Sequence, residues 1–423
     1  MEFREVKLKN GANLLLVPRK DTEAITLLVH IGVGSRYESD DIAGITHFLE
    51  HMFFDGTKCR PTAQAISREL DSLGAEYNAY SLEDITGYHI KAASEHFKKI
   101  ADILSDMLIN SNFKEKEIEK ERRVIIEEIK MREDILVSHV HNIFAEGIYA
   151  GTTLGRRIGG FIKTIELIDR EKLLDYKNKH YLAENFRICV CGNYSVLGEN
   201  SVIKIIERKF SSLKAKNLPA IPNLVGLEPK KINFLEKKSN QANLIVGFPG
   251  PKYNSEDRLA VALLSIILGG NMSSRMFQEI REKQGLAYDV RSYFENFADI
   301  GAIYTQAGVA IGKTAKALKS ITRQYEKVKI DLNEEELQRA KSYLIGQAKI
   351  GLEDSYELAE FFMRQKRYIE KVLTPVQLFA KISKVTRPEI IATANKYLDF
   401  GKMSIAAIGP ESVREDIEKN YQI

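Results

Sequence analysis

An internal repeat constrains the fold of this 423-residue chain more than any other feature. In each half a Gly-x-x-Tyr stretch stands between an expected helix and an expected strand, and its tyrosines, Tyr77 and Tyr288, are 211 residues apart. Near the end of each half, Tyr181 and Tyr397 precede an apolar strand and a glycine, and they are 216 residues apart. Two anchors at nearly one offset indicate two copies of one folding unit.

The pattern within each copy predicts an α+β fold. Amphipathic helical patterns dominate, and a few short apolar or alternating stretches are typical of strands. After a hairpin within residues 3–18, the expected strands are 25–33, 75–81, 85–92 and 186–191 in the first half, and 241–248, 287–296, 300–308 and 402–408 in the second. We therefore expect two homologous halves, each a mainly antiparallel sheet packed with helices.

A proline-rich stretch separates the two copies. Three X-Pro pairs, the last ending at Pro229, interrupt the helical and strand periodicity that precedes and follows them. We therefore expect a first domain at 1–211, a linker at 212–230 and a second domain at 231–423.

Composition narrows the class of protein. With 44% hydrophobic and 28% charged residues, this is an ordinary soluble globular composition. The net charge of +4 comes without a long Lys/Arg run, which argues against nucleic acid as a partner, and no stretch of about 18 apolar residues is present to span a membrane. No signal peptide is visible after Met1, and three cysteines are few, so we expect a reducing, cytoplasmic location. Cys189 and Cys191 are interpreted as one buried strand face rather than a metal clip.

The stretch His47-Phe48-Leu49-Glu50-His51 has the side chains of a hydrolytic metal site. Two histidines four residues apart lie on one face of a helix, and the glutamate projects to the same side. Imidazoles hold zinc in such sites, and a carboxylate accepts a proton from water. The spacing is the H-x-x-E-H signature, and all eight histidines precede the linker, so only the first half is expected to hold a metal. The alternative is a plain helix with two polar residues and a satisfied glutamate.

A catalytic zinc site needs a third protein ligand. The helix expected at 118–131 has an apolar stripe, with Glu121 and Glu128 together on its flank and Glu127 facing water. A metal would account for one of the two flanking carboxylates, and the other could orient a ligating histidine. Alternatively, both pair with Arg or Lys residues of this helix.

With residues 121–128, Glu-Arg-Arg-Val-Ile-Ile-Glu-Glu, the motif resembles the inverted-motif zinc peptidases, the family of pitrilysin, insulin-degrading enzyme and mitochondrial processing peptidase. The Phe-Asp-Gly-Thr stretch at 54–57 fits the same family. The resemblance implies that Glu128, with 76 residues between it and His51, is the third ligand. It also implies that Glu121, seven residues earlier, supports the ligands.

The resemblance further implies how a substrate is held. Asn78 and Ala79 lie on the strand that in this family runs along the substrate backbone. Arg281 and Tyr288 match the pair with which the half without metal grips the substrate, so the two halves are expected to face each other across a cleft. Residues 151–160 depart from the family's usual sequence, and a local difference in that loop is expected.

The function implied by the resemblance is that of a zinc metalloendopeptidase acting on peptides or unfolded protein segments. One Zn²⁺ per chain would be bound by the three ligands, Glu50 would act as general base, and Arg281 and Tyr288 would add hydrogen-bond donors. A homodimer is expected, with a heterodimer as the alternative. Two other functions stay open: a non-catalytic structural or partner subunit of the same family, and a metallohydrolase of another substrate class.

Overall fold

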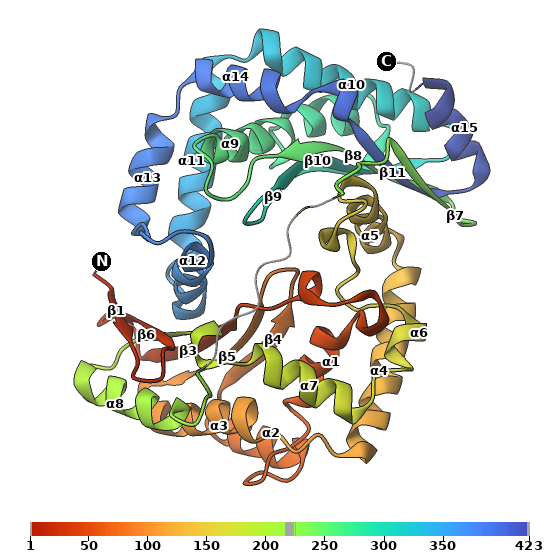
Figure 1. Ribbon diagram of the computed structural model, residues 1–423. Coiled ribbons are helices and arrows are strands. Elements are labelled where there is room, and N and C mark those ends of the chain that lie inside the picture. The colour runs from red at the N-terminus through yellow and green to blue at the C-terminus, as the bar shows by residue number, and fades with distance from the viewer. Residues whose placement is uncertain (1, 216–223, 225, 421–423) are drawn as a thin grey trace. The chain divides into compact units, whose positions relative to one another are not determined.

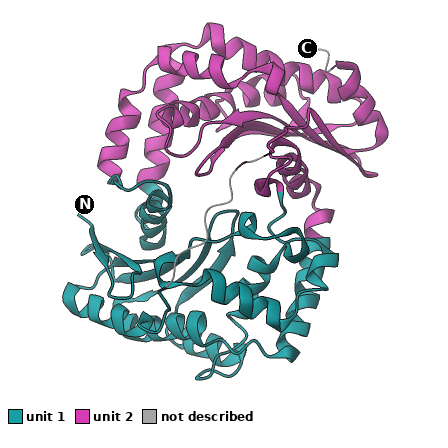
Figure 2. Ribbon diagram, viewed as in Figure 1, with its two compact units in different colours: residues 1–130, 156–222, 350–374 teal, residues 131–155, 223–349, 375–423 magenta. Residues whose placement is uncertain are grey.

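The computed structural model describes residues 2–215, 224 and 226–420. These residues form two compact units, which Figure 2 shows in different colours. Unit 1 takes its residues from 1–130, 156–222 and 350–374, and unit 2 takes its residues from 131–155, 223–349 and 375–423. Each unit therefore includes a segment from the other half of the sequence.

A six-stranded sheet forms the centre of unit 1 (Figure 1). Its strands are β1 (Arg4–Lys7), β2 (Asn13–Pro18), β3 (Ala24–Ile31), β4 (Glu76–Ser81), β5 (Thr86–Ala93) and β6 (Phe186–Gly192). The order is β1-β2-β6-β3-β5-β4; β2 and β6 run parallel, and all other neighbours are antiparallel. The predicted N-terminal hairpin and the predicted strands of the first half are confirmed.

A five-stranded sheet with the same plan forms the centre of unit 2. Its strands are β7 (Ile232–Glu236), β8 (Gln241–Gly250), β9 (Ala287–Asn296), β10 (Gly301–Ala310) and β11 (Ser404–Gly409). The order β7-β11-β8-β10-β9, with β7 and β11 parallel and the rest antiparallel, repeats the order β2-β6-β3-β5-β4 of unit 1. The predicted α+β fold with two homologous halves is thus confirmed. Strand β7 was not predicted, because it is short and only partly buried.

Helices surround both sheets. Unit 1 has α1 (Ile45–Met52), α2 (Ala63–Ser72), α3 (Phe97–Asn110), most of α4 (Glu115–Asp134), α6 (Ile162–Ile165), α7 (Arg170–His180), α8 (Glu199–Phe210) and α12 (Ser355–Tyr368). Unit 2 has α5 (Leu136–Ile148), α9 (Arg258–Gly269), α10 (Thr314–Asp331), α11 (Glu334–Gly351), α13 (Pro375–Lys384), α14 (Arg387–Tyr397) and α15 (Glu411–Asn420). The helix predicted at 273–283 is mainly a π-helix, Phe277–Lys283, and α15 was not predicted. No helix in the described part of the chain is both long and apolar enough to span a bilayer.

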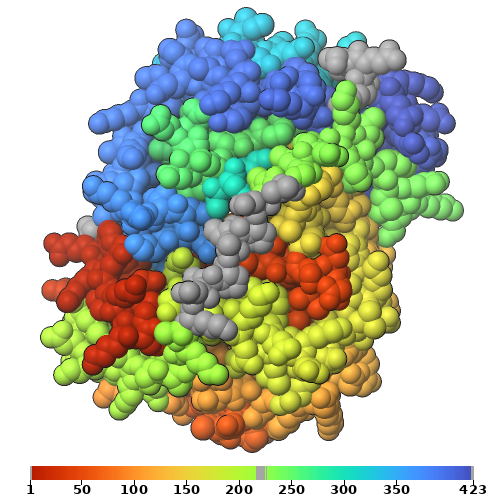
Figure 3. Space-filling view, in the orientation of Figure 1, coloured from red at the N-terminus to blue at the C-terminus, as the bar shows by residue number. Residues whose placement is uncertain are grey.

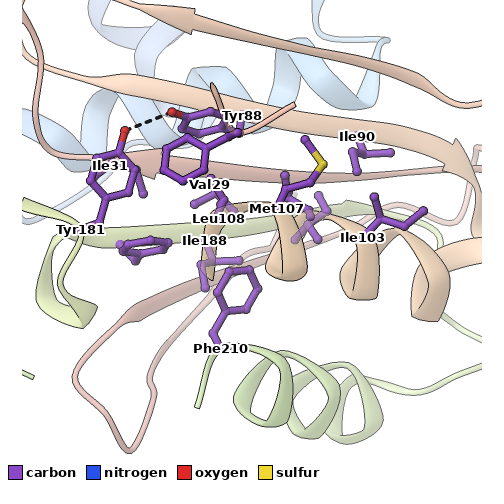
Figure 4. Close-up of a cluster of buried hydrophobic side chains, with 14 of the residues drawn as sticks. Val29, Ile31, Tyr88, Ile90, Ile103, Met107, Leu108, Tyr181, Ile188 and Phe210 are labelled. Carbon is purple, nitrogen blue, oxygen red and sulfur yellow. Dashed lines mark hydrogen bonds between the residues drawn. The ribbon is translucent and has the colours of Figure 1, made fainter. Parts of the chain in front are cut away.

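The main core of unit 1 lies between one face of its sheet and the helices packed on that face. Figure 4 shows part of this core, with Val29 of β3 and Ile188 of β6 beside Met107 of α3. At one side the hydroxyl groups of Tyr88 and Tyr181 lie 3.0 Å apart in a hydrogen bond. Each fully buried aliphatic or aromatic side chain contributes roughly 1.5–3 kcal/mol to folding. Phe48 of α1 and Ile125 of α4 belong to this core, so it holds both helices against the sheet.

The opposite face of each sheet is covered by a helix from the other half of the sequence. In unit 1, Phe362 and Met363 of α12 pack on a face that includes Cys189 and Cys191. In unit 2, α5 places Phe144 against strands β8 and β11. Burial on both faces explains why these strands are apolar at nearly every position. It also confirms that the two cysteines form one buried strand face.

The compact units differ from the continuous division expected from the sequence, 1–211 and 231–423. Helix α5 lies in the first half of the sequence but belongs to unit 2, and α12 lies in the second half but belongs to unit 1. The linker predicted at 212–230 falls partly outside the described residues, which omit 216–223 and 225.

Segments from opposite ends of the sequence lie side by side within unit 1. In Figure 3 the red atoms of the N-terminal strands meet the blue atoms of the segment that contains α12. The rings of Phe3 and Phe362 have centroids 5.0 Å apart, and Lys366 forms an ion pair with Glu5 at 2.6 Å. Unit 1 therefore depends on contacts between residues more than 300 positions apart.

Candidate metal centre

The start of helix α1, which carries the motif, is fixed by Gly44 and Glu38. Gly44 has a left-handed φ of +95°, and a β-carbon there would lie 2.7 Å from the carbonyl oxygen of Gly159, so only glycine fits. The buried Glu38 carboxylate accepts the N–H groups of Gly44 at 2.7 Å and Thr46 at 2.9 Å, which puts negative charge at the positive end of the helix. Burial raises the pKa of Glu38 to about 7, and these two hydrogen bonds act in the opposite direction.

The stretch 151–160, where a local difference was expected, ends against the start of α1. Gly160 has a φ of +69°, and a β-carbon there would lie 2.2 Å from the carbonyl oxygen of Ala43. Shortly after it, the hydroxyl of Thr164 donates a hydrogen bond to the same carbonyl at 2.7 Å. These contacts hold the motif helix from its N-terminal side.

The structure brings His47, His51 and Glu128 together. The Nε2 atoms of the two histidines are 3.3 Å apart, and each lies 3.6 Å from Oε2 of Glu128. Four-coordinate zinc holds such ligands at about 2.0–2.2 Å, so neighbouring donors stand roughly 3.2–3.6 Å apart. The three separations match that geometry. These residues, one buried and two partly buried, can therefore hold a metal ion such as zinc.

Glu121 supports this cluster from behind His51. Its Oε2 lies 3.1 Å from Nδ1 of His51, which leaves the Nε2 side of the ring to the cluster. This hydrogen bond lowers the pKa of Glu121, and the ammonium group of Lys120 lies 2.9 Å from its other oxygen. Burial alone would lower the pKa of His51, but hydrogen bonds with Glu121 and Glu128 outweigh it and raise that pKa to about 9. Two carboxylates thus place negative charge beside this ring.

Glu127, adjacent to the third cluster residue, is in a different environment. Its side chain is 71% exposed and forms an ion pair with Lys130 at 2.8 Å. The helical phase predicted from the apolar stripe of this segment is therefore confirmed. Of the neighbouring carboxylates at 127 and 128, only the second reaches the histidines.

Glu50 lies beside the cluster and is held by strand β4. The hydroxyl of Ser81 donates a hydrogen bond to Oε2 of Glu50 at 2.6 Å. Glu50, His51 and Glu121 line an open pocket of about 400 Å³. Other walls of this pocket come from Phe54 and Tyr77, whose rings stack with centroids 6.4 Å apart. The Glu50 carboxylate, one histidine of the candidate metal site and an apolar wall therefore line one pocket.

Asn78 and Ala79 also line this pocket, on a strand at the edge of the sheet. In the sheet of unit 1, β4 is the last strand and pairs with β5 on one side. Asn78 is exposed, and its side-chain oxygen accepts the N–H of Ala79 at 2.9 Å. An edge strand offers unpaired backbone groups to an added strand.

Arg281 and Tyr288 lie together in unit 2. The guanidinium of Arg281 stands 5.4 Å from the ring centroid of Tyr288 and 4.6 Å from that of Phe277. Tyr288 is 79% exposed and is the second residue of β9, which is an edge strand of its sheet. The two residues thus present a cation and a hydroxyl on the surface of their unit.

Three residues around the site were missed by sequence reasoning: Glu38, Ser81 and Lys120. Ser81 stands two positions after Ala79 on one strand, so strand alternation could have placed it on the same face. Lys120 is one of the basic residues of this helix that the alternative pairing included, but the sequence does not distinguish it from the others as the partner of Glu121. Glu38 lies six residues before Gly44, outside any capping pattern, and its contact with α1 had no sequence signal.

Comparisons with known proteins agree with this geometry. Residues 14–160 match the sequence model of a family described as "Insulinase (Peptidase family M16)", and residues 167–344 match that of "Peptidase M16 inactive domain". A Rickettsia felis protein named "Uncharacterized zinc protease" is 37% identical over 97% of this chain and 98% of its own. The Bacillus subtilis protein named "Uncharacterized zinc protease YmxG" is 34% identical over 82% of this chain and 84% of its own.

A solved structure has the same fold. It is the structure of a protease from Helicobacter pylori, with a TM-score of 0.89 and 25% sequence identity. The match covers 97% of this chain and 99% of that one. The sequence resemblance, the repeated two-sheet architecture and the cluster of two histidines and a glutamate therefore agree. The chain belongs to peptidase family M16, the pitrilysin or insulinase family.

Proposed function

We propose that this protein is a zinc-dependent endopeptidase that hydrolyses peptides or unfolded segments of proteins. The observation that carries the proposal is the convergence of His47, His51 and Glu128 at zinc-ligand separations, with the Glu50 carboxylate in the adjoining pocket. The relatives named zinc proteases support the same activity.

The three clustered side chains would hold one zinc ion per chain. When bound, zinc supplies Lewis acidity that polarises a peptide carbonyl and makes water more acidic. Glu121 orients His51 through Nδ1, so that Nε2 is available as a ligand. Glu50 accepts the proton of the attacking water and delivers it to the leaving amine. The hydrogen bond from Ser81 holds that carboxylate in the pocket.

The edge strand β4 would bind the substrate backbone. An extended peptide adds to a free strand edge through main-chain hydrogen bonds, while pockets select its side chains. Asn78 and Ala79 lie on this edge, and the stacked Phe54 and Tyr77 offer an apolar wall for one substrate side chain. Pairing with β4 needs an extended segment whose backbone is not already hydrogen-bonded, and folded proteins rarely expose one. Peptides and unfolded segments are therefore the substrates that suit this edge best.

Arg281 and Tyr288 would assist from the second half. Their close pairing and the exposure of Tyr288 support a role in gripping the substrate and stabilising the oxyanion of the transition state. In line with the family resemblance, we propose that the chain acts as a homodimer, with a heterodimer as the alternative. The second candidate function is that of a non-catalytic subunit. It is kept because residues 167–344 match a family model described as an inactive domain.

Zinc content and hydrolysis of a quenched peptide, measured on wild type and Glu50→Gln, test the proposal. Wild type should contain one zinc per chain and cleave the peptide, whereas Glu50→Gln should keep zinc and lose roughly 10²–10⁴-fold in kcat/KM. Zinc-loaded wild type that cleaves no peptide would favour the non-catalytic subunit. Full activity of zinc-loaded Glu50→Gln would remove the general-base assignment.

A further inference from the structure

Two arginines from different elements converge beside Gly32 in unit 1, outside the residues of the metal centre. Arg187 belongs to β6, and Arg367 lies in the last turn of α12. A β-carbon on Gly32 would lie 2.3 Å from Oδ1 of Asn185, 2.7 Å from Nη1 of Arg367 and 3.1 Å from Nη1 of Arg187. The absence of a side chain at Gly32 therefore lets both guanidinium groups reach the same point.

Neither arginine has a carboxylate partner in the described part of the chain. Nη1 of Arg187 is buried and has no hydrogen-bond partner there, and Arg367 donates from Nη2 to the hydroxyl of Tyr37 at 2.7 Å. The buried arginines of unit 1 are each paired with a carboxylate: Arg19 at 2.6 Å, Arg36 at 3.0 Å and Arg60 at 2.8 Å. The two cations beside Gly32 are therefore exceptional in this unit.

Two like charges held together without a counterion are costly in a partly buried place. Burial lowers the pKa of the Arg187 guanidinium to about 10, and the positive charge of Arg367 acts in the same direction. An anion placed between the two groups would offset both effects.

A cavity adjoins Arg187. It has a volume of about 190 Å³ and is lined by this arginine, by residues of β1 and β2, and by Met363 and Lys366 of α12, whereas Gly32 and Arg367 are not among its lining residues. One liquid water occupies about 30 Å³, so the cavity admits a group of several heavy atoms. The charged residues of its lining are mainly cationic, and the ammonium of Lys366 already neutralises the carboxylate of Glu5 at 2.6 Å.

We propose that Arg187 and Arg367 form a binding site for a phosphate group, either inorganic phosphate or a phosphate monoester. The planar fork of a guanidinium binds phosphate oxygens through paired N–H···O bonds. A dianion balances both guanidinium charges, whereas a carboxylate balances one. A phosphate bound here bridges β6 and α12, and so it fastens the helix from the second half of the sequence to the sheet of unit 1.

Calorimetric titration of the full-length protein with inorganic phosphate, at constant ionic strength, tests this site. Wild type should bind saturably, and phosphate should raise its melting temperature. Arg187→Gln and Arg367→Gln should each weaken phosphate binding at least tenfold. Arg68→Gln, which removes an exposed arginine of α2 with the same change in charge, should alter binding less than twofold. Equal binding by all four proteins, or no saturable binding by wild type, would overturn the proposal.

Further arms identify the ligand and exclude the metal centre. Phosphoserine competing with phosphate would show that the site accepts monoesters, and binding of phosphate alone would show that it takes the free anion. Acetate binding as tightly as phosphate would contradict the choice of a dianion. Phosphate should still bind to His51→Ala, and loss of binding there would place phosphate at the metal centre instead. If Arg187→Gln does not fold, phosphate binding is compared between Arg367→Gln, which changes a partly exposed residue, and Arg68→Gln.

Discussion

At the scale of single residues, adjacent carboxylates on α4 have opposite environments. Glu128 reaches both histidines at 3.6 Å, whereas Glu127 is exposed and pairs with Lys130. Glu128→Gln should therefore lower zinc affinity by more than the roughly 10–100-fold that loss of a supporting partner costs. Glu127→Gln, with the same chemical change, should leave zinc content and peptide hydrolysis unchanged. Elemental analysis after dialysis measures the difference, and zinc loss from Glu127→Gln alone would contradict the assignment.

Peptide hydrolysis by the variant Tyr288→Phe distinguishes a catalytic role for the second half from a structural one. Its ring lies on the surface of unit 2 beside Arg281, so Tyr288→Phe keeps the ring and removes one hydroxyl donor. If that hydroxyl stabilises the transition state, kcat/KM should fall roughly 10²-fold, as when one oxyanion donor is lost. Zinc content and melting temperature should stay at the wild-type values. Unchanged hydrolysis would leave the residue without a part in the reaction.

Local periodicity predicted only part of the cluster. Helical spacing places His47 and His51 on one face and separates Glu127 from Glu128, but it left both Glu121 and Glu128 as candidates, and only the family resemblance selected Glu128 as the third ligand. The supporting contacts were not predictable in the same way. Glu38 reaches α1 through a loop, and Ser81 reaches Glu50 across the packing of a strand on a helix, so both contacts depend on tertiary structure.

At the scale of elements, the order of strands and helices followed from the hydrophobic pattern, and the exceptions have physical causes. Strand β7 is short and partly exposed. The π-helix at Phe277–Lys283 has 7 residues, fewer than two turns, which is too short for apolar periodicity to distinguish it from an ordinary helix. Most important, the cover that α12 provides on the second face of its sheet was not predicted, because nothing local to the apolar strands identifies a helix so far away in the sequence.

Helix α12 should therefore contribute to the stability of unit 1 although it lies far away in the sequence. Phe362 is fully buried against the sheet, and its neighbour Phe361 is partly exposed. Phe362→Ala should lower the free energy of unfolding by about 3–5 kcal/mol, and Phe361→Ala, the same change on the same helix, by clearly less. Chemical denaturation measures both. Equal losses would mean that α12 does not seal this face.

At the scale of the whole molecule, the exchange of α5 and α12 makes the two halves of the sequence depend on each other. The sheet face that contains Cys189 and Cys191 is buried by residues of α12. A fragment of residues 1–215 lacks α12 and leaves that face open to water, and at the same time its own α5 loses the sheet of unit 2. Exposure of two apolar surfaces of this kind removes much of the hydrophobic stabilisation of a domain.

We therefore expect that fragments 1–215 and 224–423 do not unfold cooperatively when each is alone, and that mixing them restores a cooperative transition. Because the ligands lie in unit 1, zinc binding by fragment 1–215 should be weak alone and should recover on mixing. Full-length protein cleaved at a protease site inserted in the predicted linker is the matched control, since it loses chain continuity and keeps both helices in place. It should retain the wild-type melting temperature. If fragment 1–215 alone bound zinc at full affinity and melted cooperatively, the face under α12 would not need its cover, and the first half would be an independent domain.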